Sequence, residues 1–333
     1  MNDRSQKAAP TLLFLTSDDI RSIGVSMSEV IDVVEEAFRQ HGIGAVEMGL
    51  RAGIYPRPES FTQTLVACVP AMAAAGAKIV SVFPSNRETN LPVTSALLVL
   101  TDPATGAALS VMDATWITAA RTGAATAVAA KYLANRQARE VAIIGTGVQG
   151  RANLTALATA LPQISEARVY DIKPESARAL IEDMQALVPF KIRGVGSSQE
   201  AVEGADIVVT ATAVFAERNP LVQRKWVKPG ALIAPLEVDR ALDASLVYEP
   251  DLLIVDDTSQ TLAFQKMGCF GEGEPLIHAE LGEIVSGKKL GRKREGDIIV
   301  AMNVGLPIED IAVGHRIYHR ANGKKLGQRF IMS

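Results

Sequence analysis

A glycine-rich turn between an apolar stretch and a helix-compatible segment constrains the fold of this chain most. Four apolar residues, Val141–Ile144, run directly into Gly145, Gly147 and Gly150, which have the spacing GxGxxG. Such a turn lets the backbone approach a pyrophosphate, which then meets free N–H groups at the start of a helix. The next apolar stretch ends in Asp171, 21 residues past Gly150, and an acid there accepts hydrogen bonds from a ribose diol. This context predicts a dinucleotide-binding unit.

The acid after the second apolar stretch also bears on the choice of cofactor. A carboxylate at Asp171 repels the 2′-phosphate of NADP, so the sequence favours NAD. Lys173 follows two residues later and keeps NADP open, because its ammonium could pair with that phosphate. A glycine turn that binds no ligand is the competing interpretation, and the strand before it and the acid after it disfavour that interpretation.

The pattern of expected strands and helices divides the chain into two units. From residue 134 onward the two alternate, as in a doubly wound parallel sheet of the Rossmann type. The expected strands of this unit are Glu140–Ile144, Ala167–Tyr170, Lys191–Val195, Ile207–Thr210, Ala231–Pro235 and Leu252–Val255. After Asp257 we expect helices and loops, with Ile298–Met302 as the last strand of the chain. Before it, short strands separated by Pro, Gly and Asn follow an amphipathic helix at Met27–Gln40, which is typical of an α+β unit with a largely antiparallel sheet. An expected helix over Ile308–Ala321 returns to this first unit. We therefore expect an α/β protein with a dinucleotide-binding domain at 134–305 and an α+β domain formed by 11–133 with 306–333.

Composition and charge exclude several classes of partner. The 333 residues carry a formal net charge of −3 with dispersed basic residues, so we expect no nucleic-acid partner. No uncharged apolar run reaches transmembrane length, and residues 1–10 lack the apolar core of a signal peptide, so we expect no membrane partner. Cys68 and Cys269 lie far apart without a CxxC motif, which favours reduced thiols and a cytoplasmic location.

The sequence predicts no metal site. His315 and His319 are four residues apart on an expected helix, but no Glu-rich frame accompanies them, so we expect them to be exposed. Glu272, Glu274 and His278 could ligate a metal, although acids in a glycine-rich loop are usually solvated.

Three cations stand inside otherwise apolar segments of the first unit. Arg51 interrupts an expected strand, Lys78 follows Ala74-Ala-Gly-Ala, and Arg121 lies on a helix rich in Ala and Thr. A cation in such surroundings must pair, reach solvent or serve a ligand, and for each one alone a structural role is favoured. Together, beside a nucleotide-binding unit, they favour an anionic substrate. Arginine captures a carboxylate with two hydrogen bonds, and lysine makes a point contact with a carboxylate or an imine.

The chain resembles the ornithine cyclodeaminase/mu-crystallin family along nearly its whole length. The resemblance rests on the glycine turn, on an Arg-Thr helix before it, and on motifs within Gly76–Pro84, Leu98–Gly106, Ile117–Leu133, His278–Gly287 and Val304–Asp310. Members of the family pair a Rossmann domain with an α+β dimerisation domain. They include cyclodeaminases, imine reductases, N-substituted amino-acid dehydrogenases and alanine dehydrogenases. The resemblance implies a homodimer with the antiparallel sheet at its interface.

The resemblance also implies which residues form the site. Arg51, Lys78 and Arg121 fall where family members hold the α-carboxylate of a small amino, imino or 2-oxo acid and its adjoining imine or oxo group, and Lys78 is expected to take part in catalysis. The residues expected at the cofactor are Thr122, Gly145, Thr146, Gly147, Val148, Gln149, Gly150, Asp171, Lys173, Thr210, Thr212, Val304 and Gly305.

The loop after the fifth strand of the nucleotide-binding unit departs from the family pattern. Many members read Gly-Ala-Asp-x-Pro-Gly-Lys there, and their Asp is the acid/base residue. This chain reads Leu236-Glu-Val-Asp-Arg240. Counting from the strand assigns the catalytic position to Asp239, with Glu237 as an alternative, since either carboxylate at a strand's C-terminal edge could transfer a proton. Counting back from a later Leu-Asp pair implicates Asp243, which is better placed to cap the next helix.

The leading hypothesis is an NAD(H)-dependent imine reductase or amino-acid dehydrogenase, which moves a hydride between nicotinamide and an α-imino or α-amino acid. Ornithine cyclodeamination, which releases ammonia and leaves NAD unchanged overall, is the alternative reaction, and the missing Pro-Gly-Lys disfavours it. A non-catalytic, NAD-bound carrier of a small ligand is the alternative of another class. The presence of Arg51, Lys78 and Arg121 disfavours the carrier.

Overall fold

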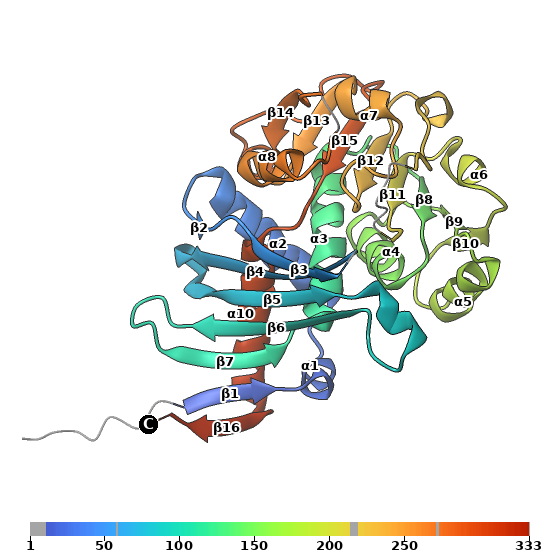
Figure 1. Ribbon diagram of the computed structural model, residues 1–333. Helices are drawn as coiled ribbons and strands as arrows, with labels where there is room; N and C mark the ends of the chain where they lie inside the picture. The colour runs from blue at the N-terminus through green and yellow to red at the C-terminus, as the bar shows by residue number, and fades with distance from the viewer. Residues whose placement is uncertain (1–10, 58, 214–218, 271–272, 333) are drawn as a thin grey trace, which may run out of the picture.

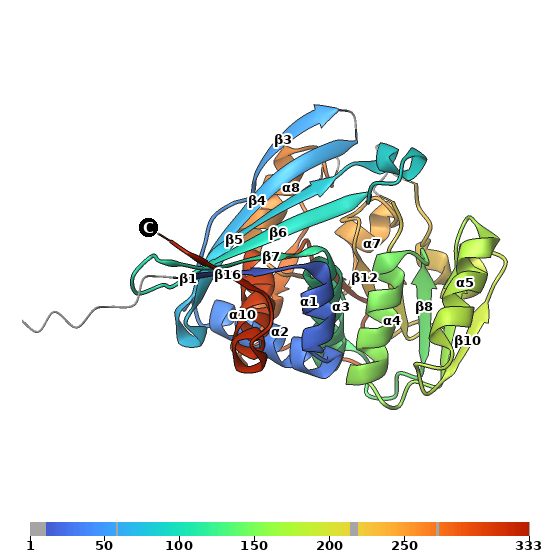
Figure 2. The ribbon, with the colours of Figure 1, turned by 90° about the horizontal axis from the view of Figure 1, so that it is seen from below.

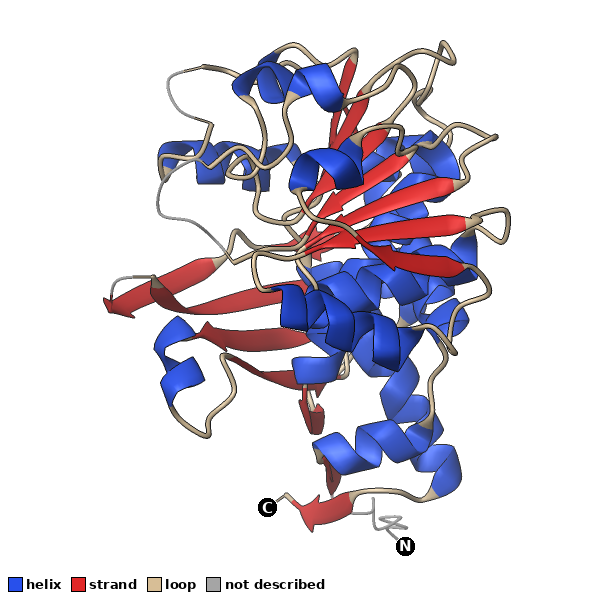
Figure 3. Ribbon diagram, turned by 90° about the vertical axis from the view of Figure 1, so that its right-hand side faces the viewer, coloured by secondary structure: helices blue, strands red, loops and turns tan. Residues whose placement is uncertain are grey.

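The computed structural model describes residues 11–57, 59–213, 219–270 and 273–332. Its strands form two separate eight-stranded sheets, which lie side by side (Figure 1, Figure 3). Helix α3 (Thr115–Leu133) runs between the sheets and packs against strands of both. The expected fold class, an α/β protein with a doubly wound sheet and a second α+β unit, is confirmed.

The sheet of the C-terminal half, here called the parallel sheet, has the order β10-β9-β8-β11-β12-β15-β13-β14, and all its neighbouring strands are parallel. Its strands are β8 (Glu140–Ile144), β9 (Glu166–Tyr170), β10 (Lys191–Gly194), β11 (Ile207–Thr210), β12 (Leu232–Pro235), β13 (Leu252–Val255), β14 (Ile277–Glu280) and β15 (Ile299–Met302). The central strands β11, β12, β13 and β15 are buried at every position, as parallel strands between helices must be. The strand order reverses between β8 and β11, where a doubly wound sheet opens a crevice at its carboxyl edge.

Short helices connect these strands in the alternation that the sequence predicts. They are α4 (Val148–Ala160), α5 (Pro174–Met184), α6 (Ser198–Val202), α7 (Ala244–Tyr248), α8 (Thr258–Lys266), α9 (Leu281–Val285) and the 3-10 turn η3 (Arg224–Trp226). None of the helices in the described part of the chain combines the length and the apolar character that crossing a bilayer requires.

The other sheet, here called the mixed sheet, has the order β16-β1-β7-β6-β5-β4-β2, and β3 also pairs with β4. Its neighbours are antiparallel except for β1 and β7. Its strands are β1 (Thr11–Leu15), β2 (Glu47–Met48), β3 (Ala52–Arg57), β4 (Ser60–Val69), β5 (Ala74–Val82), β6 (Thr94–Thr101), β7 (Ala108–Asp113) and β16 (Gln328–Ile331). Its shorter connections are α1 (Ser17–Ile23), η1 (Pro70–Met72) and η2 (Pro84–Glu88).

Helix α10 (Pro307–Lys324) covers one face of the mixed sheet, and helix α2 (Met27–Gly42) packs on α10 on the side away from the sheet (Figure 2). Helix α2 begins at Ser26, whose hydroxyl accepts the N–H of Glu29 in a capping box, a motif that satisfies donors at a helix start. Helix α10 begins with proline, as first helical turns favour, and packs on α2 and on strands β4, β5 and β6. The expected return of the last helix to the first unit is therefore confirmed.

The opposite face of the mixed sheet exposes apolar side chains. Val66 on β4, Ile79 on β5 and Leu97 on β6 are 51%, 43% and 47% exposed, and Ile79 is in register with Leu97. Their sequence neighbours Leu65 and Leu98 are buried on the helical side, which is the alternation of a sheet with one covered face. A contiguous apolar face of this kind is typical of an interaction surface.

The sequence-based expectations fail in two segments. The region after Asp257, expected to be helical and loop-like, also contains strand β14, which joins the parallel sheet beside β13. Strand β16 follows the last helix and pairs with β1, although no strand was expected there. Both strands have only four residues and lie at a sheet edge, so neither has the long apolar run that marks a buried strand.

Candidate functional site

The three glycines of the turn occupy three different environments. A Cβ on Gly145, whose φ is +96°, would lie 2.4 Å from the carbonyl oxygen of Ala211. One on Gly150 would lie 2.1 Å from the carbonyl oxygen of Gly145, where helix meets strand, whereas one on Gly147 would meet nothing within 4 Å. These are the tight turn, the helix–strand contact and the open approach that a dinucleotide site needs. The turn therefore fits the pyrophosphate of NAD.

Within the described ranges, no side chain caps the start of helix α4 at this turn. Gly147 is its N-cap residue and provides no capping side chain, and Val148 is 68% exposed. Nearby, the side-chain oxygen of Gln149 is buried without a hydrogen-bond partner among the described residues. Uncapped N–H groups at a helix start attract an anion, so Gly147, Val148 and Gln149 lie where the sequence predicts cofactor contacts.

Asp171 lies beside the glycine turn, directly after β9. Its Oδ2 accepts hydrogen bonds from the N–H and the hydroxyl of Thr146, at 2.8 and 2.9 Å, and its Oδ1 accepts the N–H of Lys173 at 3.0 Å. The carboxylate is therefore oriented by the backbone of the turn, at the place where an acid meets the adenosine ribose of a dinucleotide.

Glu237 is bound to the two threonines expected at the cofactor. Its Oε2 accepts the hydroxyl of Thr210 at 2.6 Å, and its Oε1 accepts both the hydroxyl of Thr212, at 2.6 Å, and the backbone N–H of Thr212. Burial raises the pKa of Glu237, and the bonds from both threonines oppose that rise. These contacts give Glu237 a role in positioning Thr210 and Thr212.

Asp239 follows a residue with a strained backbone, and its carboxylate does not share the threonine partners of Glu237. Val238 has φ of +62°, a region that a β-branched residue rarely adopts. Asp239 is buried, and its Oδ2 accepts the backbone N–H of Phe270 at 3.1 Å. Asp243 accepts the N–H of Ser245 at 3.0 Å and is the N-cap of α7, which is the capping role that the sequence favours for it.

Lys78 and Arg121 meet at two acids on the last helix. Lys78, on β5 and 1% exposed, donates from Nζ to Oδ1 of Asp310 at 2.7 Å. Arg121, on α3, donates from Nη1 to Oε2 of Glu309 at 3.0 Å, and its Nε lies 3.3 Å from Oδ1 of Asp310. Both acids belong to the first turn of α10. The structure therefore brings these two expected substrate residues together around a shared carboxylate.

Arg51 reaches the same place from the loop before β3. Its Nη2 donates to the carbonyl oxygen of Gly305 at 2.9 Å and to that of Val304 at 3.3 Å, and its guanidinium carbon lies 4.8 Å from the ring centre of Phe264. A Cβ on Gly305, whose φ is +86°, would lie 1.9 Å from Nη1 of Arg121. Gly305 thus separates the two guanidinium groups, and only glycine fits there.

Burial and mutual charge determine the protonation of this cluster. Burial lowers the pKa of Lys78 to about 8, although the carboxylate of Asp310 opposes the shift. Burial also disfavours the charged form of Arg121, but Asp310 and Glu309 raise its pKa overall. Because loss of water disfavours charge unless a partner compensates, Lys78 is a group in the cluster that can exchange a proton near neutral pH.

Four residues that sequence analysis missed complete the cluster. Asp256, fully buried after β13, accepts the N–H of Gly305 at 2.6 Å, and burial together with Glu309 raises its pKa to about 7. Asn303 is 7% exposed, and neither polar atom of its amide has a partner among the described residues. Glu309 and Asp310 stood in a quoted motif but resembled ordinary acids of a first helical turn. Asp256 had a usable signal, its place at a strand's carboxyl end, whereas Asn303 had none.

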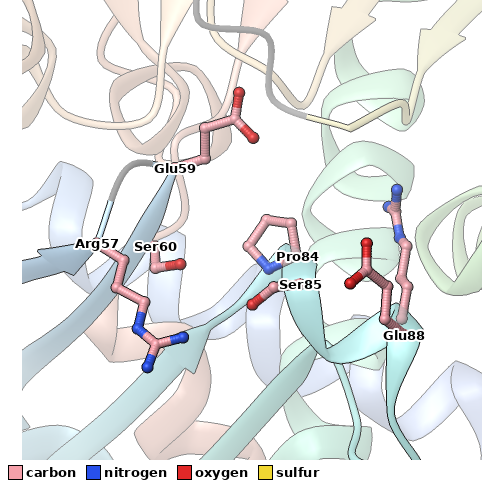
Figure 4. Close-up of a pocket in the computed structure, with 7 residues that line it drawn as sticks. Arg57, Glu59, Ser60, Pro84, Ser85 and Glu88 are labelled. Carbon is pink, nitrogen blue, oxygen red and sulfur yellow. The ribbon is translucent and has the colours of Figure 1, made fainter.

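The hollow drawn in Figure 4 is separate from this cluster. It measures about 470 Å³ and lies between the turn joining β3 to β4 and the 3-10 turn η2. Its lining residues are Arg57, Glu59, Ser60, Pro84, Ser85, Arg87 and Glu88. None of these lining residues is among the site residues that the sequence predicts. The candidate site is therefore the cluster around Gly305 at the carboxyl edge of the parallel sheet.

The fold and the site define a class of protein, a dinucleotide-binding α/β protein with a basic cluster next to its nucleotide sheet. The model of the ornithine cyclodeaminase/mu-crystallin family matches residues 13–325. The chain belongs to this family, which confirms the resemblance that the sequence motifs indicate.

Individual relatives agree in fold over nearly the whole chain. The structure of Thermococcus litoralis Δ1-pyrroline-2-carboxylate reductase with NADH and L-proline is 36% identical, with a TM-score of 0.85, and the match covers 95% of this chain and 99% of that one. An archaeal alanine dehydrogenase dimer with bound NAD is 30% identical, with a TM-score of 0.86 and coverage of 96% and 99%. The alanine dehydrogenase of Archaeoglobus fulgidus is 33% identical over 95% of this chain and 97% of its own length.

Proposed function

We propose that this chain is an NAD(H)-dependent oxidoreductase that interconverts an α-imino acid and an α-amino acid. The observation that carries the proposal is one cluster of three cations at the carboxyl edge of a sheet whose glycine turn fits NAD: Arg51 and Arg121 lie next to Gly305, and Lys78 joins Arg121 at Asp310. The relatives support it, since one reductase is described with NADH and L-proline and the others are alanine dehydrogenases.

The two arginines orient the substrate. A planar guanidinium binds a carboxylate with two parallel hydrogen bonds, and Arg51 and Arg121, both from the mixed-sheet half, lie next to Gly305. A carboxylate held between them fixes the position of the adjoining Cα, and fixed geometry of reacting groups lowers the barrier. When bound, the nicotinamide supplies or accepts a hydride at that carbon.

Lys78 is the proposed proton donor in reduction and proton acceptor in oxidation. Its pKa of about 8 lies close to neutral pH, where a general acid or base is most effective. Asp239 was the other candidate from the sequence, and its contact with the N–H of Phe270 favours a role in holding that loop. Glu237 is occupied by Thr210 and Thr212. The contacts of the three residues therefore favour Lys78.

The unpartnered amide of Asn303 supports a ligand at this place. A buried amide without hydrogen bonds has a high free-energy cost, and Asn303 lies between β15 and Gly305. The carboxamide of nicotinamide or the polar group of a substrate would satisfy it. We propose Asn303 as a further ligand contact, alongside the cofactor residues predicted from the sequence.

Three further expectations stay proposals. We propose a domain at 134–305 around the parallel sheet and a domain at 11–133 with 306–333 around the mixed sheet. The apolar face bearing Val66, Ile79 and Leu97 is the proposed interface of a homodimer, an assembly described for the archaeal alanine dehydrogenase. Sedimentation of the wild type and of a Leu97→Glu variant tests the dimer, because a charge on this face would separate the subunits. The cytoplasmic location also stays a prediction, and the free thiols of Cys68 and Cys269 agree with it.

One assay separates the candidate reactions. NADH absorbance is followed with Δ1-pyrroline-2-carboxylate and with pyruvate plus ammonium, and ornithine is then incubated with catalytic NAD while ammonia is measured. Net oxidation of NADH by an imine supports the reductase or dehydrogenase. Ammonia and proline formed from ornithine without net oxidation would overturn it in favour of the cyclodeaminase. No turnover, with tight binding of NAD and of a small carboxylate, would favour the carrier.

A further inference from the structure

A histidine and two carboxylates meet where helix α2 contacts the half built on the parallel sheet. His41 lies in the last turn of α2, Asp257 is the N-cap of α8, and Glu280 is the N-cap of α9. One ligand atom from each of the three side chains lies within 4.8 Å of the others. We propose that these three residues bind a divalent transition-metal ion, with Zn²⁺ as the type ion, and that the ion ties α2 to the parallel-sheet half.

Each carboxylate is anchored by its other oxygen. Oδ1 of Asp257 accepts the N–H of Gln260 at 2.7 Å, and Oε1 of Glu280 accepts the N–H of Thr258 at 2.9 Å. Oδ2 and Oε2 are thereby directed toward the imidazole. Metal-ligand carboxylates are usually held in this way by outer hydrogen bonds, which reduce the entropy lost when an ion binds.

The separations fit the ion with a small adjustment. Nε2 of His41 lies 3.2 Å from Oδ2 of Asp257 and 3.9 Å from Oε2 of Glu280. Zinc binds nitrogen and oxygen ligands at about 2.0–2.2 Å, so its tetrahedral ligands stand about 3.3–3.5 Å apart. One of the two separations is already near this range, and the other needs a shift of about half an ångström in a Glu side chain. Three protein ligands and one water are the usual set for an accessible zinc ion.

Charge and accessibility agree with a cation at this place. In the described part of the chain neither Asp257 nor Glu280 forms an ion pair with Lys or Arg. Their two negative charges are therefore opposed only by His41 among the described residues. The side chains of His41, Asp257 and Glu280 are 8%, 13% and 24% exposed. The cluster is therefore shielded enough to strengthen electrostatic attraction and open enough for an ion to enter from solvent.

The location gives such an ion a structural consequence. Gly42 follows His41, and a Cβ on Gly42 would lie 1.8 Å from the carbonyl oxygen of Gly282, so α2 and α9 touch through their backbones. An ion bound by His41, Asp257 and Glu280 would clamp this contact. Asp256, the residue before Asp257, accepts the N–H of Gly305, so the clamp would also steady one support of the candidate active site.

Zinc binding is measured on the full chain after treatment with a chelator, by calorimetry and by thermal unfolding with zinc alone. His315→Gln and His319→Gln are introduced first, because Nε2 atoms of that pair lie 2.9 Å apart on α10 and could chelate the ion themselves. We expect one zinc ion per chain and a rise of a few degrees in Tm, since a ligand that binds only the folded state stabilises it.

Replacement of the ligands decides the outcome. In that background His41→Gln abolishes the binding and the rise in Tm, whereas His278→Gln, which removes the other remaining histidine, leaves both unchanged. Glu280→Gln, at the most exposed ligand, weakens binding at least 10-fold and serves if His41→Gln fails to fold. Zinc binding that survives both ligand variants, or no binding in the background protein, would overturn the proposal. These readouts do not depend on turnover, so the proposed reaction can fail without affecting them.

Discussion

The two halves of the molecule build their parts of the site by different means. The half with the parallel sheet presents backbone: the glycine turn, the uncapped start of α4 and the Val304–Gly305 segment. The half with the mixed sheet presents charged side chains, two of which are paired with acids on α10. A site made of backbone is encoded by consecutive residues, whereas a charged cluster needs partners that are distant in sequence. The backbone part of the site should therefore tolerate side-chain substitutions better than the charged cluster does.

The largest expected effect is that of Arg121→Met. This variant removes the partner of the buried Glu309 and Asp310, and an uncompensated buried charge costs about 3–5 kcal/mol. We expect kcat/KM to fall by at least about 1000-fold, since the substrate carboxylate also loses its bidentate partner. We expect the affinity for NADH, measured by fluorescence titration, to change less than about threefold, because additivity holds for separate sites.

Arg121→Lys is the matched control for this variant. It keeps the charge that Glu309 and Asp310 need but loses the planar fork, so it should fold like the wild type and still lose most turnover. A collapse of NADH affinity in either variant would show that the two halves do not bind their ligands separately.

Lys78→Met should have the next largest effect. The change keeps the volume of the side chain but removes the proposed proton donor, and such groups contribute about 100-fold or more. We expect kcat to fall by roughly 100-fold in steady-state assays with NADH and an imine. An unchanged kcat would show that Lys78 does not transfer the proton, and Asp239 would again be the leading candidate for the acid/base residue.

The pH dependence of the wild type provides a sharper test of Lys78. Reduction needs its charged form, and with a pKa of about 8 that form is lost as the pH rises, so kcat/KM for reduction should fall above pH of about 8. Oxidation needs the neutral form and should rise over the same range. In Asp310→Asn the ammonium loses the carboxylate that stabilises it, while Arg121 and Glu309 stay near it. The fall should then begin at lower pH, and a profile that stays in place would contradict this assignment.

Asp171→Ala tests the half built on backbone. The variant loses the acceptor for Thr146 and for the ribose diol but leaves the glycine turn in place. A lost hydrogen bond to a charged group costs about 1.5–3 kcal/mol, so we expect KM for NADH to rise about 10-fold or more with kcat little changed. KM for NADPH should rise less, because the repulsion of its 2′-phosphate is removed. An equal rise in KM for NADH and NADPH would show that Asp171 does not contact the ribose.

The smallest expected effect is that of Asp239→Asn. The amide oxygen still accepts the N–H of Phe270, so we expect kcat to change by less than about threefold, well below the 100-fold typical of a lost acid/base group. Glu237→Gln is the comparison, and it should raise KM for NADH through Thr210 and Thr212. A loss of about 100-fold in Asp239→Asn alone would show that Asp239 transfers the proton.

Much of the parallel-sheet half could be predicted from the sequence. The strands Glu140–Ile144, Ile207–Thr210 and Leu252–Val255 have the predicted bounds, because apolar runs between turn residues carry the signal for a buried strand. Edge strands such as β14 and β16 could not be predicted, since their pairing depends on a neighbour that is distant in sequence.

By itself the sequence determined the dinucleotide unit, the class of fold and the three cations as candidates for one site, because each depends on local spacing or on residue type in an apolar segment. Only the tertiary structure decided how those cations are paired. It joined Lys78 and Arg121 through Asp310, placed Gly305 between Arg51 and Arg121, and gave the amide of Asn303 no partner among the residues that it describes. The physical reason is that protonation, pairing and burial depend on distances of a few ångströms between segments such as α3 and α10, and chain order alone does not set those distances.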